Sequence, residues 1–537
     1  MAFMHSSTVR ASKTPNVLYS RLVTPPSSGE GAGLPGQVAF LNGLNAFHRA
    51  GHLHDFEDGK REFIGGHGRT PVLLVQGPPG TGKSRSSAFA VFARLQGAMR
   101  ENRPYRVFFS CKTHAATDVL LKNVVAVQEK LQELRTADPK LFGAHFDARL
   151  LEVPVYRIAP NDPPPAGVVH LLKNDEKGDD EDYNADVILE SEWGVVGTTP
   201  GGTYGMLKKK WPKNIFGHEL CDLLVLDEAS QMSLPEAIMA ALPLKEDATL
   251  IVVGDHRQMP PIVKHDWDAE ARRTFRQFQV YESVFDTLRA QHPPIIRFAE
   301  SYRLHAAMAD FLREEVYRHD GIPYHSKKRD GLPIHPVADD LAAAVLDPDY
   351  PLVVVVHDEA ESQMQNPFEQ ALIEPVLRAL ADPTKYGLDA TDGVGIVVPH
   401  RAQRAALQQS FPELCILDPD TGMPVRSAID TVERFQGGER TVIIVSATES
   451  DRAYLLASSK FLLDPRRLTV ALSRAKQKMI LVASRSIFSL FSTDEETFAN
   501  SLLWKNLLLR TCTTLLWEGE REGKKVAVWG GKGQSLA

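Results

Sequence analysis

The sequence has few cysteines, no long apolar run and no excess of positive charge, and each absence excludes a class of protein. The four cysteines among 537 residues are Cys111, Cys221, Cys415 and Cys512. They form no Cys-x-x-Cys pair, which argues against a zinc site or a disulfide framework and fits a reducing cytoplasm. No stretch is long and apolar enough to cross a bilayer, and no signal-peptide core is present, so we expect a cytoplasmic protein without a membrane partner. The net charge of −7 means that a polyanionic partner would need a local basic groove.

The chain is too long for one compact core, so two or more domains are expected. Short apolar runs rich in β-branched residues alternate with helical stretches, a pattern typical of parallel sheets covered on both faces. The predicted strands are residues 71–76, 106–110, 194–198, 222–227, 249–255, 352–357, 394–399, 441–447 and 478–483. The fold class is therefore predicted to be α/β and doubly wound.

Several segments fall outside this pattern. Residues 57–69 are rich in glycine, histidine and charge and are predicted to form a surface loop. Residues 173–186 carry a dense acidic run, which we interpret as a solvated loop rather than an acidic gate. The histidines His48, His52 and His54 have near-ligand spacing but no partner, so they are expected to face solvent rather than to hold zinc.

A phosphate-binding loop follows the first predicted strand. It matches G-x-x-x-x-G-K-[ST] and consists of Gly77, Pro78, Pro79, Gly80, Thr81, Gly82, Lys83 and Ser84. A strand before it and a helix after it provide the context that the motif requires. Its glycines let backbone N–H groups cradle phosphate oxygens at a helix N-terminus. Lys83 is then expected to reach the β- and γ-phosphates of ATP, and Ser84 to hold Mg²⁺.

An acidic pair ends another predicted strand, and it suits the second half of a nucleotide site. Asp227 is placed to complete the Mg²⁺ shell, and Glu228 beside it to orient and polarise the attacking water. A GTPase would show an [NT]-K-x-D element that reads guanine, and none is present. A small-molecule kinase would not need the motifs that follow.

Seven further motifs occur in order along the chain. They span residues 110–118, 197–201, 254–261, 302–305, 395–403, 431–440 and 467–476. In sequence and order they resemble the motifs of superfamily 1 helicases, in the branch that contains the nonsense-decay RNA helicase, senataxin and the immunoglobulin-mu-binding helicase. The resemblance runs from about Gln37 to Trp504, which is nearly the whole chain.

This resemblance implies further nucleotide contacts. By it Gln37 reads adenine, Tyr302 stacks on the base, Glu439 contacts the ribose and Gln258 contacts the γ-phosphate. Arg303 and Arg474 would be the arginine fingers, because a guanidinium is a planar, permanent cation that can stabilise charge on the transferring phosphoryl group. The chain departs from the family where Gly437-Gly438-Glu439 replaces the usual Gly-Arg-Glu.

The resemblance also implies contacts to single-stranded DNA or RNA. These residues are Thr113, His114, Thr198, Thr199, Pro399, His400 and Thr431. Hydroxyl groups and backbone N–H groups suit contact with phosphates, which every base shares. The run Lys208–Trp211 is either a grip on phosphates and a base or a solvated basic turn.

The domain organisation that follows is two tandem RecA-like P-loop NTPase domains. We expect the first at residues 35–290, with a small helical insert at about 128–192, and the second at 291–517. Residues 1–34 are rich in Ser, Pro, Gly and Thr without a periodic pattern and are expected to be a flexible tail or a truncated stub. The stretch before the P-loop leaves little room for the β-barrel usual in this branch. Residues 518–537 are expected to be a C-terminal tail.

The function expected from the sequence is an ATP- and Mg²⁺-dependent helicase or translocase on single-stranded nucleic acid, with 5′→3′ movement implied by the branch. An alternative is an ATP-switched clamp or assembly subunit without processive unwinding, acting with a partner protein. A third reading, a helicase–nuclease, requires a nuclease domain outside this chain. Backbone-reading motifs do not distinguish DNA from RNA.

Overall fold

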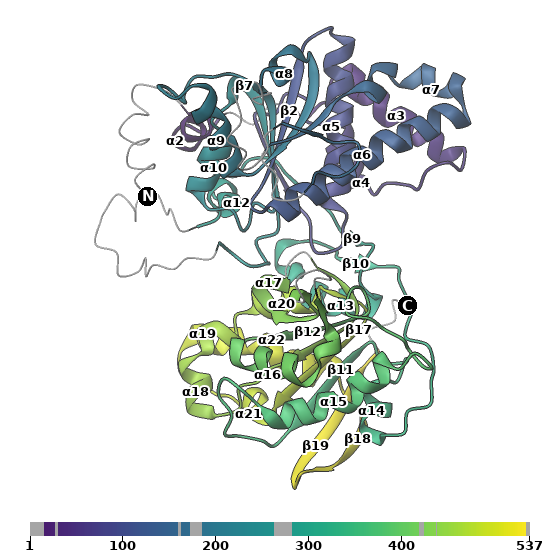
Figure 1. Ribbon diagram of the computed structural model, residues 1–537, viewed down its shortest axis with the longest axis vertical. Coiled ribbons are helices and arrows are strands. Elements are labelled where there is room, and N and C mark those ends of the chain that lie inside the picture. The colour runs from purple at the N-terminus through teal and green to yellow at the C-terminus, as the bar shows by residue number, and fades with distance from the viewer. Residues whose placement is uncertain are drawn as a thin grey trace. The chain divides into compact units, whose positions relative to one another are not determined.

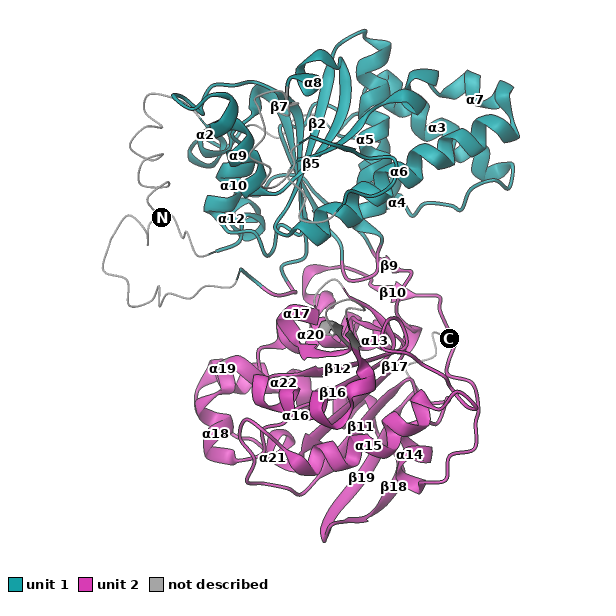
Figure 2. Ribbon diagram, viewed as in Figure 1, with its two compact units in different colours: residues 1–77, 82–256, 260–298 teal, residues 78–81, 257–259, 299–537 magenta. Residues whose placement is uncertain are grey.

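The computed structural model describes residues 16–26, 31–158, 163–171, 185–261, 282–417, 424–435 and 438–532. It divides into two compact units (Figure 2), of which the first comprises residues 1–77, 82–256 and 260–298. The second comprises residues 78–81, 257–259 and 299–537. Each unit is a mainly parallel sheet with helices packed against it, so the expected α/β class is confirmed (Figure 1). The last crossing from the first unit to the second follows Phe298, whereas the sequence placed the division after residue 290.

The first unit contains an eight-stranded sheet in which every pair of neighbours is parallel, in the order β4-β3-β5-β2-β6-β7-β1-β8. Its strands are β1 (Val72–Gln76), β2 (Tyr105–Cys111), β3 (Val155–Arg157), β4 (Val169–His170), β5 (Trp193–Thr198), β6 (Cys221–Asp227), β7 (Leu244–Gly254) and β8 (Ile295–Arg297). Adjacent residues of a strand point to opposite faces, so Leu73 and Val75 join one apolar core and Val72 and Leu74 the other. Two buried faces explain why these strands read as continuous apolar runs.

Helices cover both faces of this sheet. They are α2 (Val17–Val23), α3 (Pro35–Arg49), α4 (Asp58–Gly65), α5 (Lys83–Arg100), α6 (His114–Ala137), α7 (Pro139–His145), the 3₁₀ helix η1 (Ala148–Glu152), α8 (Ala185–Glu190), α9 (Pro200–Lys210), α10 (Leu234–Ala240) and α12 (Val284–Arg289). The helices α3, α5 and α6 contribute to the core that contains Leu73, whereas α9, α10 and α12 contribute to the core that contains Leu74. Because the strands are parallel, their carboxyl ends lie at the same edge of the sheet, which is where ligands bind in such sheets.

The expectation of a flexible N-terminal tail is wrong for residues 16–23. Helix α2 buries Leu18, and the Asn16 side-chain amide donates a hydrogen bond to the Ile238 carbonyl oxygen at 3.1 Å. The Arg21 guanidinium donates to the carbonyl oxygens of Pro71 at 2.8 Å and Glu246 at 3.0 Å. These backbone acceptors carry no signal in the sequence, which is why the segment looked unstructured.

Two other expectations for the first unit also need correction. Most of the predicted loop at 57–69 is helix α4, which buries Phe63 and Ile64. The predicted small helical insert at 128–192 is not separate from the sheet, because β3 pairs with β5 and β4 pairs with β3. Residues 172–184, which hold nearly all of the acidic run, lie outside the described residues.

The second unit contains a seven-stranded sheet in the order β15-β12-β16-β17-β11-β19-β18 and two short two-stranded sheets. Its strands are β9 (Glu300–Ser301), β10 (His325–Ser326), β11 (Leu352–His357), β12 (Val394–Val398), β13 (Cys415–Leu417), β14 (Pro424–Ser427), β15 (Ile429–Thr431), β16 (Arg440–Ser446), β17 (Ala475–Ser484), β18 (Thr514–Arg521) and β19 (Lys524–Gly531). The part of the large sheet from β15 to β11 is parallel. All nine strands predicted from the sequence are present in the two units.

Helices flank this second sheet as well. They are α13 (Ala306–Glu315), the 3₁₀ helices η3 (Tyr317–Asp320) and η4 (Pro412–Leu414), α14 (Asp340–Val345), α15 (Pro367–Ala381), α16 (Arg401–Ser410), α17 (Val432–Phe435), α18 (Arg452–Ala457), α19 (Ser459–Leu462), α20 (Pro465–Leu472), α21 (Arg485–Phe488), α22 (Glu495–Asn506) and the π-helix η5 (Leu507–Thr511). Across the described part of both units, no helix is both long enough and apolar enough to span a membrane.

The expectation of a C-terminal tail at 518–537 is wrong as far as Gly531. Strands β18 and β19 form an antiparallel hairpin, and β19 pairs antiparallel with β11 along the whole of that strand. Gly523 stands at the turn with φ +74°. The hairpin escaped prediction because half of its strand residues are Glu, Lys, Ala or Gly, which are depleted in strands.

A buried lysine makes the stability of the second unit depend on pH. Lys478 in β17 is buried and donates to the carbonyl oxygens of Asp347 at 2.7 Å and Tyr350 at 2.6 Å. Burial lowers its pKa from 10.5 to about 7. Between these values the unfolded chain binds one proton more than the folded chain, so stability rises with pH across that window.

We therefore expect the free energy of unfolding to increase from pH 7 to pH 9 by up to about 1.4 kcal/mol per pH unit from this residue alone. Denaturant titrations of the wild type and Lys478→Met at several pH values measure this component, which the substitution should remove. The exposed Lys525 in β19 provides the control, since Lys525→Met should leave the pH profile as in the wild type. An unchanged profile in Lys478→Met would contradict the assignment.

Candidate nucleotide and nucleic-acid sites

The P-loop connects β1 to α5 and has the geometry of a phosphate cradle. Gly80 and Gly82 have φ of +73° and +76°, a conformation that favours glycine. At Gly80 a side chain would also place its Cβ atom 2.6 Å from the Cβ atom of Arg303. Lys83 opens α5, and its ammonium group donates to the Gly77 carbonyl oxygen at 2.6 Å. The lysine is thus folded back over its own loop, where phosphate oxygens can replace the carbonyl.

Ser84 and Asp227 meet at the carboxyl edge of the first sheet. The Ser84 hydroxyl donates to the Asp227 carboxylate (Oγ to Oδ2) at 3.0 Å. Burial raises the pKa of Asp227 despite opposing effects from the Glu228 N–H group, Lys83 and Ser84. A hydroxyl and a carboxylate oxygen side by side are ligands that Mg²⁺ prefers, so these residues fit the ion that the sequence implied.

Glu228 directly follows the end of β6 in a conformation that is uncommon for residues other than glycine. Its φ is +52°, and its N–H group donates to Asp227 Oδ1 at 2.9 Å. Gln231 donates to the Glu228 carboxylate at 3.4 Å. A non-glycine residue held at positive φ costs free energy and is frequent at functional sites. The backbone here turns Glu228 away from the line of the strand, beside the buried Asp227.

The two arginines predicted as fingers lie close together in the second unit. Arg303 Nε is 2.5 Å from the Glu439 carboxylate, and Arg303 Nη1 donates to the Ser473 carbonyl oxygen at 3.3 Å. Arg474 is buried, and its guanidinium donates to the Gln258 side-chain oxygen at 3.3 Å. The structure therefore groups four of the predicted residues, namely Gln258, Arg303, Glu439 and Arg474.

Residues 78–81, the tip of the P-loop, belong to the second unit and make specific contacts there. The Tyr302 N–H group donates to the Gly80 carbonyl oxygen at 2.8 Å. The Pro79 carbonyl oxygen accepts from the Tyr324 hydroxyl at 2.6 Å and from the Ser301 hydroxyl at 3.3 Å. The sequence gave no reason to single out Tyr324, which lies outside every recognised motif.

Glu439 has an ion-pairing role in this arrangement. Burial opposes its ionisation, but the charges of Arg303 and Lys476 together hold its pKa below the ordinary value. Lys476 Nζ lies 3.3 Å from the carboxylate. The residue assigned by resemblance to the ribose is therefore the counter-ion of a predicted arginine finger. Gln436 and Gly437 of the same motif lie outside the described residues.

The prediction that Gln37 reads adenine is wrong for this structure. Gln37 is fully buried near the start of α3, where its amide donates to the carbonyl oxygens of Ile64 at 2.9 Å and Gly66 at 2.6 Å. Its backbone nitrogen lies beside Gly97, which is near the far end of α5 from the P-loop. The motif matched as letters, but the structure places its glutamine against the C-terminal end of α4.

The predicted nucleic-acid contacts of the first unit divide into surface and interior residues. Thr113 caps α6 and is exposed. His114, next to it, contacts the guanidinium of the buried Arg157 at 3.0 Å. Thr198 is wrongly predicted as a contact, because it is 0% exposed and its hydroxyl donates to the Thr199 carbonyl oxygen at 3.0 Å. Thr199 is also buried, and its side chain caps α9 by accepting from the Gly202 N–H group.

Arg157, which the sequence did not single out, organises this edge. Its guanidinium is fully buried at the end of β3 and donates to the Asp118 carboxylate at 2.6 Å. It thereby holds the first turns of α6 against the sheet. By contrast, Lys208–Trp211 stands at the other end of α9 from Thr199, where Trp211 stacks on His218 and Lys210 pairs with Asp186. The run is therefore the last turn of α9 and its C-cap rather than the solvated basic turn considered from the sequence.

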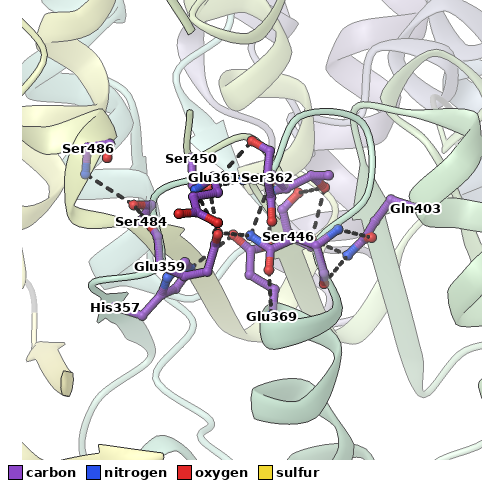
Figure 3. A network of polar contacts seen from close by, with 12 residues as sticks. His357, Glu359, Glu361, Ser362, Glu369, Gln403, Ser446, Ser450, Ser484 and Ser486 are labelled. Carbon is purple, nitrogen blue, oxygen red and sulfur yellow. Dashed lines mark hydrogen bonds and ion pairs between the residues drawn. The ribbon is translucent and has the colours of Figure 1, made fainter. Parts of the chain in front are cut away.

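At the carboxyl edge of the second sheet, a polar network surrounds the buried carboxylates of Glu359 and Glu369 (Figure 3). Glu369 accepts from the Ser446 hydroxyl at 2.5 Å and the Thr448 N–H group at 3.0 Å, and it pairs with His357. Burial opposes the ionisation of Glu359, but hydrogen bonds led by that from the Ser450 hydroxyl lower its pKa.

The network reaches the predicted nucleic-acid residues through Gln403 and Glu449. The Gln403 side-chain oxygen accepts from the Asn366 N–H group at 2.9 Å, and its amide donates to Ser446 at 3.1 Å. His400 Nε2 lies 2.7 Å from the fully buried Glu449 carboxylate. His400 and its neighbour Pro399 are thus held at the end of β12, and Thr431 ends the adjacent β15. Glu449 could have been noticed as an acidic residue just after a predicted strand.

Comparison with known proteins gives consistent matches in both halves of the chain. Two family models, each described as an AAA domain, match residues 61–264 and 280–486. The chain is 29% identical over 279 residues to the DNA replication ATP-dependent helicase/nuclease JHS1 of Arabidopsis thaliana, covering 50% of this chain and 19% of that protein. It is 27% identical over 296 residues to the DNA replication ATP-dependent helicase/nuclease DNA2 of Mus musculus, covering 52% and 26%.

The match that covers most of the chain here is to a Drosophila melanogaster protein, the regulator of nonsense transcripts 1 homolog. The identity is 26% over 521 residues, which is 92% of this chain and 38% of that protein. The chain thus spans less than two fifths of the length of each of these relatives.

The buried Asp227 predicts a gain in stability when its charge is removed. Since burial raises the pKa of this carboxyl, the ionised form destabilises the folded protein at neutral pH. Asp227→Asn keeps acceptor geometry for the Glu228 N–H group and should raise the melting temperature of the nucleotide-free protein by a few degrees. Thermal unfolding at pH 7 measures this.

The matched control is Asp222→Asn in the same strand. Asp222 is also buried, but it pairs with Lys245 at 2.7 Å and accepts from the Arg106 N–H group at 2.9 Å. Losing this charge should lower the melting temperature. Equal effects of the two substitutions would contradict a specific penalty at Asp227.

Proposed function

Since this chain belongs to superfamily 1B of the helicases, in the branch of the nonsense-decay helicase and senataxin, we propose that it hydrolyses ATP to move along single-stranded nucleic acid. The observation that carries the proposal is the pair formed by Ser84 and Asp227 at 3.0 Å, beside a P-loop with two left-handed glycines. The relatives are named as ATP-dependent helicases or as a regulator of transcripts, which agrees with this class of activity.

The first step assigned to the chain is binding of the triphosphate. The P-loop N–H groups and Lys83 neutralise the β- and γ-phosphates, and Lys83 exchanges its bond to the Gly77 carbonyl oxygen for one to phosphate. Ser84 and Asp227 would hold Mg²⁺, which when bound neutralises charge on the phosphate oxygens. The charge of Asp227, costly without a partner, would then be compensated.

The second step is attack by water on the γ-phosphate. Glu228 accepts a hydrogen bond from the water and takes its proton, while its backbone remains fixed through Asp227. Gln258 is assigned to the γ-phosphate, and Arg303 and Arg474 to the charge that develops in the transition state. Arginine fingers contribute roughly 10³–10⁵ in rate in related phosphoryl-transfer enzymes.

The third step couples this chemistry to the strand. We assign phosphate contacts to Thr113, His114 and Thr199 in the first unit and to Pro399, His400 and Thr431 in the second. If the γ-phosphate alternately binds and releases Arg303 and Arg474, the grip of the two units on one strand alternates and the protein steps. We assign 5′→3′ movement by analogy with the branch, and either DNA or RNA as the track.

Glu228→Gln should leave nucleotide binding intact and reduce strand-stimulated ATPase activity by roughly 10²–10⁴-fold, because the amide cannot take the proton. The assay compares steady-state ATPase rates with matched single-stranded DNA and RNA oligonucleotides. The control is Glu246→Gln, a change at an exposed residue of β7, which should retain the wild-type rate. Stimulation that persists in Glu228→Gln would overturn the catalytic assignment.

The same preparations separate a motor from a clamp. A motor displaces the complementary strand of a duplex with a single-stranded 5′ tail in an ATP-dependent manner. ATPase activity that single strands stimulate without displacement on either tail would favour the ATP-switched clamp, and displacement from a 3′ tail alone would overturn the assigned direction.

Arg303→Ala and Arg474→Ala should each lower the ATPase rate by about 10³-fold or more while ATP binding changes much less, since the guanidinium groups act in the transition state. Single-turnover hydrolysis and equilibrium binding provide the two measurements. Arg318→Ala is the control, because Arg318 is largely exposed and its ion pair with Glu314, at 3.6 Å, lies on the surface. Loss of binding equal to the loss of rate would instead assign these arginines to ground-state recognition.

A further inference from the structure

The position of Gln37 removes the expected reader of the nucleobase from the nucleotide site. Its backbone nitrogen lies 3.8 Å from where a Cβ atom of Gly97 would stand, and Gln96 donates to the Gly36 carbonyl oxygen at 2.8 Å. Gly97 lies fourteen residues beyond Lys83 on the same helix. At 1.5 Å per residue, the axial separation from the P-loop is about 21 Å. A glutamine side chain does not reach that far.

The amide of Gln37 is also fully engaged. A glutamine amide has two N–H donors, and here they go to Ile64 at 2.9 Å and Gly66 at 2.6 Å. The buried Arg94 adds bonds to the Phe63 carbonyl oxygen at 3.1 Å and to Gly66 at 3.2 Å. These acceptors are the last carbonyl groups of α4 and its C-cap, which have no partner within the helix. Gln37 therefore serves as a helix cap that holds α4 in place.

The element that does lie beside the start of the P-loop is the N-terminal end of α4. A Cβ atom on Gly59 would stand 2.5 Å from the Arg297 carbonyl oxygen, and Arg297 pairs with Gln76, the residue before the P-loop. Residues 55–62 around it contain no asparagine or glutamine. Their charges are used in local pairs, with Lys60 3.0 Å from Glu57 and Arg61 3.2 Å from Asp58.

Among the described residues, Tyr302 is the candidate for contact with the base, and stacking does not distinguish one base from another. The Tyr302 side chain is 47% exposed, while its backbone is fixed to Gly80 in the P-loop tip. Every nucleobase offers a π-face, so aromatic stacking tolerates any of them. A site that hydrogen-bonds a substrate group rejects analogues lacking it by roughly 10⁴–10⁵-fold, whereas a site without such bonds cannot.

We infer that the enzyme is a nucleoside triphosphatase with little base selectivity, in which α4 has converted the adenine-reading glutamine into a structural cap. The inference rests on the proposed function, and it names the substrate class as purine and pyrimidine ribonucleoside triphosphates. Recognition is then carried by the triphosphate and by stacking on the base.

The test compares kcat/KM for ATP, GTP, CTP and UTP under saturating single-stranded nucleic acid. The four values should fall within about tenfold of one another, and a preference for ATP above 100-fold would overturn the inference. Binding of fluorescent mant-ADP and mant-GDP to the wild type gives a readout without hydrolysis. If no triphosphate is hydrolysed, the proposed function fails, while the ratio of the two dissociation constants still decides base selectivity.

The variant Gln37→Ala tests the conversion itself. It leaves the Ile64 carbonyl oxygen without its side-chain donor and the Gly66 carbonyl oxygen with Arg94 alone, so the melting temperature should fall while the ratio of the mant-ADP and mant-GDP dissociation constants stays within twofold of the wild type. A selective loss of adenine-nucleotide binding would overturn the inference. Should Gln37→Ala not fold, Gln37→Glu replaces it, and the ratio of the two dissociation constants is again expected to stay within twofold of the wild type. The wild-type comparison of four nucleotides tests base selectivity independently of both variants.

Discussion

The contact between the Ser84 hydroxyl and the Asp227 carboxylate depends on the parallel arrangement of the first sheet. Strands β1 and β6 are separated only by β7, and all three run in the same direction, so the loops that follow β1 and β6 leave the same edge. This places the first residues of α5 beside the end of β6, although the two are 143 positions apart. Burial raises the pKa of this carboxyl, so a cation bound there, as proposed, would stabilise the folded protein.

The two predicted arginine fingers of the second unit are each held by a polar partner. Arg303 is paired with Glu439, and the buried Arg474 is bonded to Gln258. Both guanidinium groups are thus held in position, and the charge of Arg303 is partly neutralised by Glu439. A phosphate must compete with Glu439 for Arg303, which links arginine engagement to the presence of the γ-phosphate in the proposed cycle.

Much of the fold was predictable from the sequence because the relevant signals are local. Each of the nine predicted strands is a continuous apolar run, and each is buried on both faces as that pattern requires. The P-loop and the acidic pair were likewise predicted as neighbours, and the bond from Ser84 to Asp227 shows that they are. The roles assigned to these residues stay predictions.

What the sequence did not predict depends on long-range contacts or on the direction of a side chain. Gln37 matched its motif, but its position is set by α4, whose helical character was hidden by glycine and charge. Thr198 matched a backbone-contacting loop, but it is the last residue of a buried strand and its hydroxyl points inward. Arg21 of helix α2 donates to backbone carbonyl groups, and because every residue has one, the sequence does not identify them as partners.

The terminal hairpin has a consequence for the integrity of the second sheet. Strand β11 is apolar from Leu352 to Val356 and would be an edge strand if β19 did not pair with it. An apolar edge invites association with other chains, whereas the outer strand β18 presents Glu518, Glu520 and Arg521. The hairpin therefore gives the sheet a charged edge strand in place of an apolar one. Truncation before residue 518, where the tail was expected to begin, would remove β19, leave β11 as the edge strand and favour self-association.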